Sequence, residues 1–92
     1  MADSMESRHS VRIPNKYGLH ARPAAEFVKL AGRFQSDVLV SKDDLEVNGK
    51  SIMGVMMLAA ECGSAITIRA AGDDAHDAVA QLVALVQRGF GE

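Results

Sequence analysis

The feature that most restricts the fold of this chain is the way in which two hydrophobic periodicities alternate along it. Apolar residues recur at every second position in four short segments, "HSVRI" (9–13), "DVLVSK" (37–42), "LEVN" (45–48) and "AITIRA" (65–70). This pattern predicts four strands that each bury one face, and it favours a mainly antiparallel sheet. Asp43-Asp44 fits the hairpin turn between the second and third strands.

Three segments with helical spacing lie between and after these strands. The first runs from Arg22 to Ala31, and Gly32 is placed to end it in a left-handed cap. The second begins near Ser51, and the last is closed by Gly89. The last helix has the clearest apolar stripe, formed by Ala75, Ala78, Val79, Leu82, Val83 and Val86.

Small size and weak net charge exclude several classes of function. A chain of 92 residues forms one domain with a modest core and no deep cleft between lobes, which disfavours a stand-alone enzyme. The net charge of −2 and the 4% of aromatic residues give no basis for binding nucleic acid. No apolar stretch approaches the roughly 20 residues of a membrane span, so we expect no membrane insertion.

Residues 1–7 are polar and aperiodic and are predicted to be a flexible extension, which leaves residues 8–92 as the folded domain. The extension lacks the apolar segment of a signal peptide, so we expect a cytoplasmic protein. Cys62 is the single cysteine, which excludes an internal disulfide and a thiolate zinc site. We expect Cys62 to be buried as a small hydrophobic residue.

The stretch "GLHARPAA" (18–25) places His20 at the start of the first helix. The amides of Ala21 and Arg22 have no partner within a helix that begins there, so we expect the ring to lie beside them. Free amides, the positive end of the helix dipole and the guanidinium of Arg22 suit an anion. Pro23 is tolerated in a first turn, and Gly18 lets the preceding chain bend sharply. An uncharged imidazole at such a place can accept a phosphoryl group, but a lone histidine at a helix start is more often a helix cap or a surface residue.

The middle helical segment "SIMGVMML" (51–58) is apolar nearly all round. A short helix on a small sheet cannot bury every side of itself, so we expect Met53 and Met56 to be exposed. Exposed methionine forms an adaptable docking surface. The alternative is that all these side chains belong to the core.

Two further motifs have simpler explanations than a ligand site. The acids of "GDDAHD" (72–77) surround His76 as in a metal cluster, but acids in a first helical turn satisfy free amides, and no metal-ligand spacing is present. We therefore predict helix capping and no metal. "NGKS" (48–51) is similar to the end of a phosphate-binding loop, but Asp44 stands where that motif needs glycine. His9, in the first strand, is expected at the surface.

Taken together, "GLHARPAAEF" and "GKSIMGVMMLA" resemble HPr, the histidine-containing phosphocarrier family of the phosphoenolpyruvate-dependent phosphotransferase system (PTS), from about Arg8 to Phe90. The resemblance implies an α+β fold, the open-faced β-sandwich of that family. Its four-stranded antiparallel sheet carries three helices on one face, in the order βαββαβα. The strands and helices deduced from periodicity follow the same order.

The resemblance also implies roles for individual residues. His20 matches the histidine that Enzyme I phosphorylates at Nδ1, and Arg22 matches the arginine that steadies the phosphoryl group during transfer to an enzyme IIA domain. Ser51 matches the serine that HPr kinase/phosphorylase modifies in many bacteria. The positions that match partner-docking residues are Ala21, Ala25, Ile52, Met53 and Met56. The resemblance implies no cofactor. It also implies transient one-to-one docking with partners, so we expect a monomer.

Some features leave the physiological pathway open. Tyr17 stands where many sugar-pathway members have serine or asparagine. "NKYGLHARPA" and "RGFGE" resemble the nitrogen-branch regulatory phosphocarriers, whereas "KSIMGVM" resembles members that a serine kinase controls. A further alternative is a protein-binding module regulated through Ser51. Relatives of that kind lack the active-site histidine, whereas His20 is present here.

Overall fold

The computed structural model describes residues 5–92. Four strands and three α-helices alternate along the chain, and a short 3-10 turn follows the last helix. Their bounds are β1 (Glu6–Arg12), α1 (Ala21–Ala31), β2 (Asp37–Lys42), β3 (Leu45–Asn48), α2 (Ile52–Met57), β4 (Ala65–Ala71), α3 (Ala75–Gln87) and η1 (Gly89–Gly91). The predicted order βαββαβα is confirmed.

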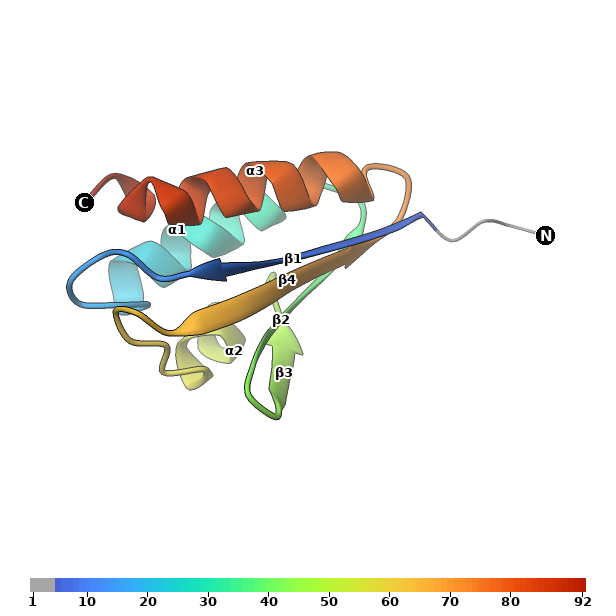
Figure 1. The fold of residues 1–92 in the computed structure, drawn as a ribbon. Coiled ribbons are helices and arrows are strands. Elements are labelled where there is room, and N and C mark those ends of the chain that lie inside the picture. The colour runs from blue at the N-terminus through green and yellow to red at the C-terminus, as the bar shows by residue number, and fades with distance from the viewer. Residues whose placement is uncertain (1–4) are drawn as a thin grey trace.

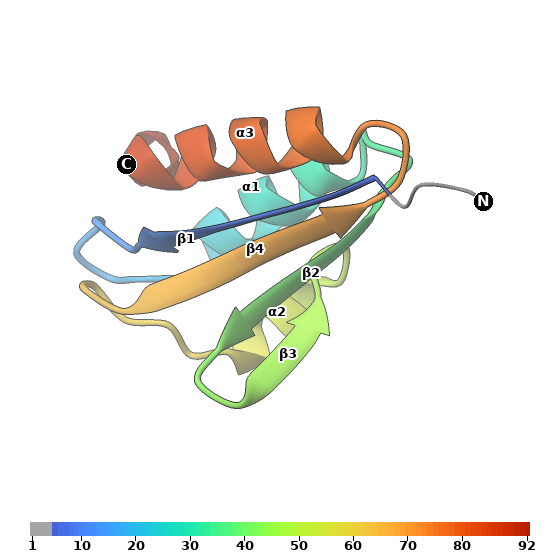
Figure 2. The ribbon, with the colours of Figure 1, turned by 45° about the vertical axis from the view of Figure 1, so that its right-hand side comes forward.

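The strands form one antiparallel sheet in the order β1-β4-β2-β3. Figures 1 and 2 show the three helices on the same side of this sheet, which leaves its other face open. The open-faced α+β sandwich is therefore confirmed. β1 and β4 lie under α3, and α2 lies near β3.

The core lies between the sheet and the helices because alternate strand residues point toward the helices. Val38, Val40, Ile66 and Ile68 are buried in this layer, and Phe27 of α1 is buried with them. The residues between them face the open side.

On that open side Arg69 joins strands across the sheet. It donates hydrogen bonds to Glu6 at 3.0 Å and to Glu46 at 3.1 Å. These two hydrogen bonds, with the one to Glu6 as the larger cause and the one to Glu46 as the next, hold the pKa of Arg69 above its ordinary value. These contacts link both edge strands to β4.

The ends of several elements differ from the sequence prediction. β1 begins at Glu6, since Glu6 and Ser7 pair with Ala71 and Ala70 of β4. Only part of the predicted extension of residues 1–7 thus precedes the strand, and residues 1–4 lie outside the described residues. The predicted hairpin turn is present, with Asp43 at φ 55°.

The predicted left-handed cap at Gly32 is wrong. Gly32 has φ −66° and ψ −13°, which is right-handed helical backbone. The amide of Arg33 donates to Leu30 and that of Phe34 to Ala31, so the helix tightens into 3-10 turns instead of reversing its hand. Gly89 does adopt the left-handed region, at φ 65°, where it ends α3 as predicted.

The acids before α3 do not cap it in the predicted way. Asp74 is the N-cap residue but makes no side-chain cap bond. Its carboxylate instead accepts hydrogen bonds from the Ser36 hydroxyl and from the amides of Gln35 and Ser36, the amides at 2.9 and 3.0 Å. The Ser36 hydroxyl and then the Gln35 amide lower the pKa of Asp74. Asp74 therefore joins the start of α3 to the chain that enters β2.

The prediction that Cys62 is buried is also wrong. Cys62 is exposed in the loop between α2 and β4, and its thiol lies 3.6 Å from the carbonyl oxygen of Pro14. Across residues 5–92, no helix is long and apolar enough to cross a membrane. The same residues contain no group of three or more His, Cys, Asp and Glu side chains that could hold a metal ion.

Candidate functional site

His20 is the N-cap residue of α1, with extended backbone at φ −76° and ψ −170°. Its carbonyl oxygen accepts the first helical hydrogen bond, from the amide of Ala24 at 3.0 Å. The amides of Ala21 and Arg22 precede that bond, and Pro23 has no amide hydrogen. The His20 side chain is 41% exposed, so the ring is accessible to a partner protein.

The loop before His20 is held against the loop that follows α2. The amide of Leu19 donates to the carbonyl oxygen of Ala60 at 2.9 Å, and the amide of Gly18 donates to Asn15 at 3.1 Å. Gly18 has φ 68°, a backbone conformation that favours glycine. This arrangement places His20 at the surface directly after the buried Leu19.

The His20 ring has a partner that the sequence did not predict. Its Nε2 lies 2.9 Å from Oε2 of Glu92. The other carboxylate oxygen of Glu92 accepts a 3.0 Å hydrogen bond from the amide nitrogen of Asn15. The ring makes no side-chain cap hydrogen bond to α1, and its placement beside the amides of Ala21 and Arg22 stays a prediction. Within residues 5–92 its hydrogen bonding is confined to Nε2.

Arg22 and Glu92 line one hollow beside this histidine. The remaining lining residues are Pro14, Asn15, Lys16 and Tyr17. The Tyr17 ring stands edge-on to the His20 ring at 6.2 Å between centroids, and Lys16 Nζ lies 5.3 Å from the Tyr17 centroid. Two cations and one carboxylate therefore surround a space next to the exposed imidazole.

Ser51 is the N-cap residue of α2, and its hydroxyl accepts a 3.1 Å hydrogen bond from the amide of Gly54. The hydroxyl therefore caps this helix. Lys50, one residue earlier, donates to the carbonyl oxygen of Phe34 at 2.7 Å. The start of α2 is thereby fixed to the end of the α1 segment.

The apolar side chains of α2 divide into a buried and an exposed set. Val55, within the helix, and Leu58, directly after it, are buried. The exposed set, which we call the α2 patch, consists of Ile52, Met53, Met56 and Met57. The sequence predicts exposure of Met53 and Met56 and does not single out Met57. Ala21 and Ala25 are exposed on α1, the helix against which α2 packs.

Comparison with known proteins identifies the family. The family model for the PTS HPr component phosphorylation site matches residues 7–88. The chain belongs to the HPr family. The phosphocarrier protein HPr of Cupriavidus necator is 50% identical over 80 residues, which cover 87% of this chain and 90% of that protein. The resemblance deduced from the two sequence motifs is therefore confirmed.

Solved HPr-family structures have the same fold. HPr-C-His from Thermoanaerobacter tengcongensis superposes with a TM-score of 0.90 at 46% identity, and the match covers 94% of this chain and 97% of that chain. Crh of Bacillus subtilis, described as a swapped, intertwined dimer, has a TM-score of 0.74 at 49% identity, with 86% and 91% of the two chains covered. The fold is thus shared across the family, and the second structure shows that a member can dimerise.

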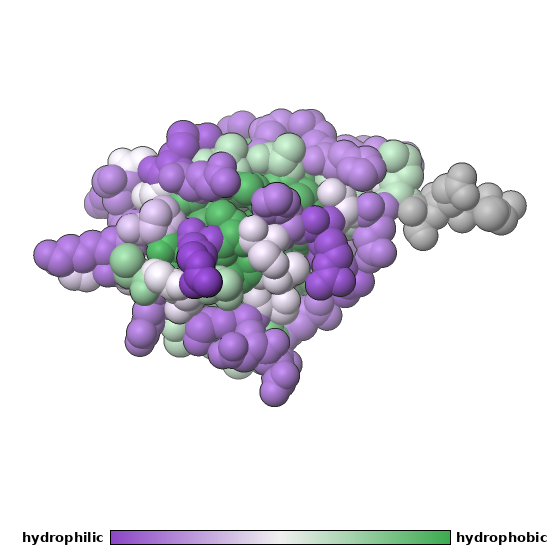
Figure 3. Space-filling view, in the orientation of Figure 1, coloured by the Kyte–Doolittle hydropathy of each residue, from purple (hydrophilic) through white to green (hydrophobic). Residues whose placement is uncertain are grey.

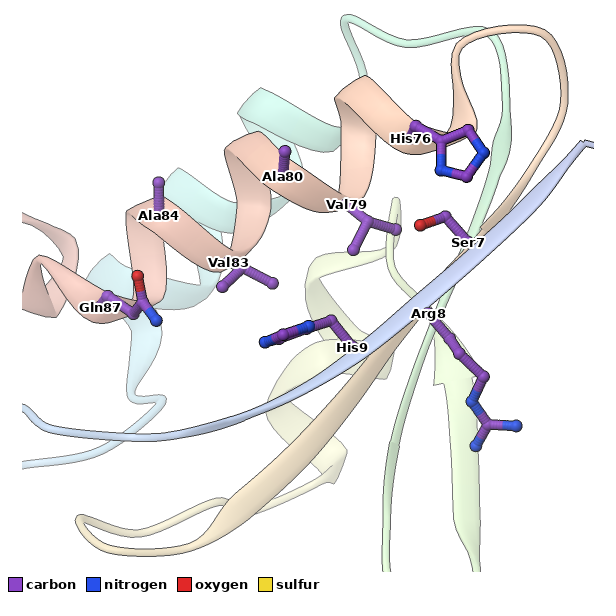
Figure 4. Close-up of a pocket in the computed structure, with 9 residues that line it drawn as sticks. All are labelled: Ser7, Arg8, His9, His76, Val79, Ala80, Val83, Ala84 and Gln87. Carbon is purple, nitrogen blue, oxygen red and sulfur yellow. The ribbon is translucent and has the colours of Figure 1, made fainter.

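This HPr-family chain has a second hollow, of about 330 Å³, between β1 and α3 (Figure 4). His9 on β1 and His76 on α3 are both exposed there, as expected for His9. Val79 and Val83 form its apolar side, and Figure 3 shows an apolar area framed by polar residues on this face of the molecule. The hollow shares no lining residue with the one that contains Arg22.

Proposed function

We propose that the protein is a phosphocarrier that accepts a phosphoryl group on Nδ1 of His20 from phosphorylated Enzyme I and passes it to enzyme IIA domains. The observation that carries this proposal is the placement of an exposed imidazole at the N-terminus of α1, with its Nε2 hydrogen-bonded to Glu92. A ring that donates from Nε2 has its lone pair on Nδ1, which is the nucleophile that phosphoryl transfer needs.

The surroundings of His20 suit a group that is held only briefly. The guanidinium of Arg22 and the ammonium of Lys16 line the adjacent hollow, and the amides of Ala21 and Arg22 lie at the positive end of α1. These groups balance the charge of a phosphoryl group on the ring. A carrier must also release its cargo, and a few donors on an exposed surface do not trap it.

Partners are proposed to dock on the surface next to His20. Ile52, Met53 and Met56 of the α2 patch supply apolar contact, and Ala21 and Ala25 on α1 are small enough to let a partner approach closely. Catalytic groups and any metal can then be supplied by the partner. This division of labour agrees with a chain too small for a deep active site.

Ser51 is proposed as a regulatory phosphorylation site for an HPr kinase/phosphorylase. A phosphate at the start of α2 adds up to about two negative charges next to Ile52 and Met53. A phosphate at a helix start is electrostatically tolerated, so the fold should change little. The effect would instead be on partners that approach the α2 patch.

Two alternative functions remain within the same family. A nitrogen-branch regulatory phosphocarrier would use His20 in the same way, and the stretches "NKYGLHARPA" and "RGFGE" of this sequence favour it. A binding module controlled through Ser51 would need only the α2 patch and the serine. The presence of an accessible His20 favours the carriers over the module.

The deciding experiment is incubation with purified Enzyme I, phosphoenolpyruvate and Mg²⁺. We expect acid-labile phosphate on the wild-type protein and none on His20→Ala, with Ser51→Ala labelled like wild type. Transfer onward is tested by adding single enzyme IIA domains of the sugar and nitrogen branches. Absence of label on the wild-type chain would leave the binding module as the function.

The oligomeric state is part of this proposal. We expect a monomer during transfer, because each partner must reach His20 in turn. The swapped dimer described for Crh makes sedimentation of this chain, with and without phosphate on His20, the measurement that decides it.

A further inference from the structure

We propose that Glu92 is a positioning residue for phosphoryl transfer, whose carboxylate keeps a proton on Nε2 of His20 so that Nδ1 alone takes and releases the phosphoryl group. The inference rests on the proposed phosphocarrier function and deepens it. It assigns a role to a residue to which the sequence analysis gave none.

The contact itself determines which nitrogen carries the proton. Oε2 of Glu92 lies 2.9 Å from Nε2 of His20, and an ionised carboxylate can only accept hydrogen bonds. Nε2 is therefore the donor, and the neutral ring has its lone pair on Nδ1. A carboxylate that fixes a histidine tautomer in this way acts through the ring and does not touch the phosphoryl group.

Glu92 is itself held from a second side. Asn15, which is 8% exposed, donates from its amide nitrogen to Oε1 of Glu92 at 3.0 Å and to the carbonyl oxygen of Gly18 at 2.7 Å. Both partners are acceptors, so the orientation of this amide is determined by its contacts. Its Oδ1 is left without a hydrogen-bond partner among the residues described. The orientation of Asn15 thus serves to hold the Glu92 carboxylate and the loop before His20.

The backbone also places Glu92 beside the histidine. The buried side chain of Phe90 anchors the 3-10 turn, and the amide of Glu92 donates to Gly89 at 3.0 Å. The turn lies against α1 and α3. Only 22% of the Glu92 side chain is exposed, so the carboxylate is part of the site and does not extend into solvent.

The proton on Nε2 matters in both directions of the transfer. When the phosphoryl group arrives, the Nδ1 lone pair forms the bond to phosphorus, and the electron pair of the broken bond leaves with the donor. The ring then carries a positive charge, which the Glu92 carboxylate balances. When the group departs, the P–Nδ1 electron pair returns to Nδ1 and the ring leaves as neutral imidazole, with its proton still on Nε2. Without that proton the leaving group would be an imidazolate anion, which is far less stable.

The experiment compares wild type with Glu92→Ala and Glu92→Gln. Glu26→Ala is the control, because it removes an exposed carboxylate from the middle of α1. Nitrogen-15 NMR of the histidine rings, before any phosphate is added, reports the proton on Nε2 of His20. We expect a hydrogen-bonded Nε2 proton in wild type and in Glu26→Ala, and its rapid exchange with water in Glu92→Ala. Thermal unfolding checks that each variant is folded.

The second measurement is made on the phosphorylated proteins at neutral pH. Loss of one hydrogen bond to the ring should slow both hydrolysis of the phosphohistidine and its transfer to an enzyme IIA domain about three- to tenfold in Glu92→Ala. Glu92→Gln, which can still accept a hydrogen bond but has no charge, should fall between that variant and wild type. A purely structural role for Glu92 would change the unfolding temperature but not the lifetime of the phosphohistidine.

The possible failures are distinct. If Glu92→Ala keeps the Nε2 proton signal and the phosphohistidine lifetime of Glu26→Ala, the role of Glu92 is overturned while the carrier function stands. If the wild-type protein takes no phosphoryl group from Enzyme I, the proposed function fails, and the role of Glu92 in transfer fails with it.

Discussion

Gly18 lies so close to Ala60 that a side chain at position 18 would collide with the Ala60 carbonyl oxygen and come within 2.9 Å of Cα of Glu61. Its φ of 68° adds a backbone penalty for any other residue. Gly18→Ala should therefore lower the free energy of unfolding by more than about 2 kcal/mol. Urea unfolding, followed by circular dichroism, measures this loss.

Gly63→Ala is the matched control for that prediction. Gly63 also has positive φ, at 89°, but a Cβ there would meet nothing within 4 Å. The Gly63→Ala variant should lose only the part of the free energy of unfolding that comes from backbone conformation, about 1–2 kcal/mol. Equal losses in the two variants would show that the contact with Ala60 does not matter and that conformation alone explains the glycine.

The order of elements could be predicted because each one leaves its own local pattern. Val38 and Val40 alternate with polar neighbours, and Val79, Leu82, Val83 and Val86 repeat at helical spacing, so the buried face of each element follows from residues a few positions apart. Exposure of Met53 and Met56 follows from counting how many sides a short helix can bury. The two hydrophobic periodicities and the family motifs together were sufficient to predict the fold.

Contacts between residues that are far apart in the sequence could not be predicted in the same way. Glu92 is 72 positions from His20, and Asp74 is 38 positions from Ser36, so no periodicity connects either pair. Cys62 lies in a loop, where burial depends on which segment packs on it and not on a repeating pattern. Such contacts arise only when the sheet and helices bring separate loops together.

Asp74 should make stability depend on pH. Its pKa in the folded state is lowered, first by the Ser36 hydroxyl and then by the Gln35 amide, so its contribution is present above the unfolded value of about 3.9. That contribution is lost as the pH falls through the lower folded pKa. Asp74→Asn should thus have a lower urea midpoint than wild type at pH 7, and the two curves should converge below about pH 4.

Asp73→Asn is the control for this pH dependence, because it removes the neighbouring exposed carboxylate and leaves the contacts of Asp74 in place. Ser36→Ala removes the hydroxyl that is the main cause of the shift, so it should reproduce part of the Asp74→Asn effect. A difference between wild type and Asp74→Asn that stays constant from pH 7 to pH 2 would mean that ionisation of Asp74 does not contribute.

Docking on the α2 patch can be tested with two methionines of equal exposure. Met56 on α2 and Met5 before β1 are each 41% exposed. Met56→Ser should weaken binding of Enzyme I about tenfold, since it removes apolar contact from the proposed interface. Met5→Ser should leave the dissociation constant unchanged, because it lies outside that surface. Calorimetric titration of both variants provides the values, and equal effects would refute a docking role for this patch.

Ser51 should control transfer through charge and not through stability. Its hydroxyl caps α2 by accepting from Gly54, and a carboxylate at that position can make the same bond. Ser51→Asp should therefore stay within about 1 kcal/mol of wild type in its free energy of unfolding. The new negative charge next to Met53 should slow phosphoryl transfer from Enzyme I about tenfold, on the expectation that the docking surface of the partner is acidic.

Ser51→Asn separates the charge from the cap, because asparagine can cap a helix without a charge. It should transfer phosphate at close to the wild-type rate, as measured by the appearance of acid-labile label on His20 over time. If Ser51→Asn is slowed as much as Ser51→Asp, the shape of residue 51 and not its charge limits docking. A large loss of stability in Ser51→Asp would instead show that the start of α2 cannot accommodate an anion. Phosphorylation would then act by unfolding the helix that carries the α2 patch.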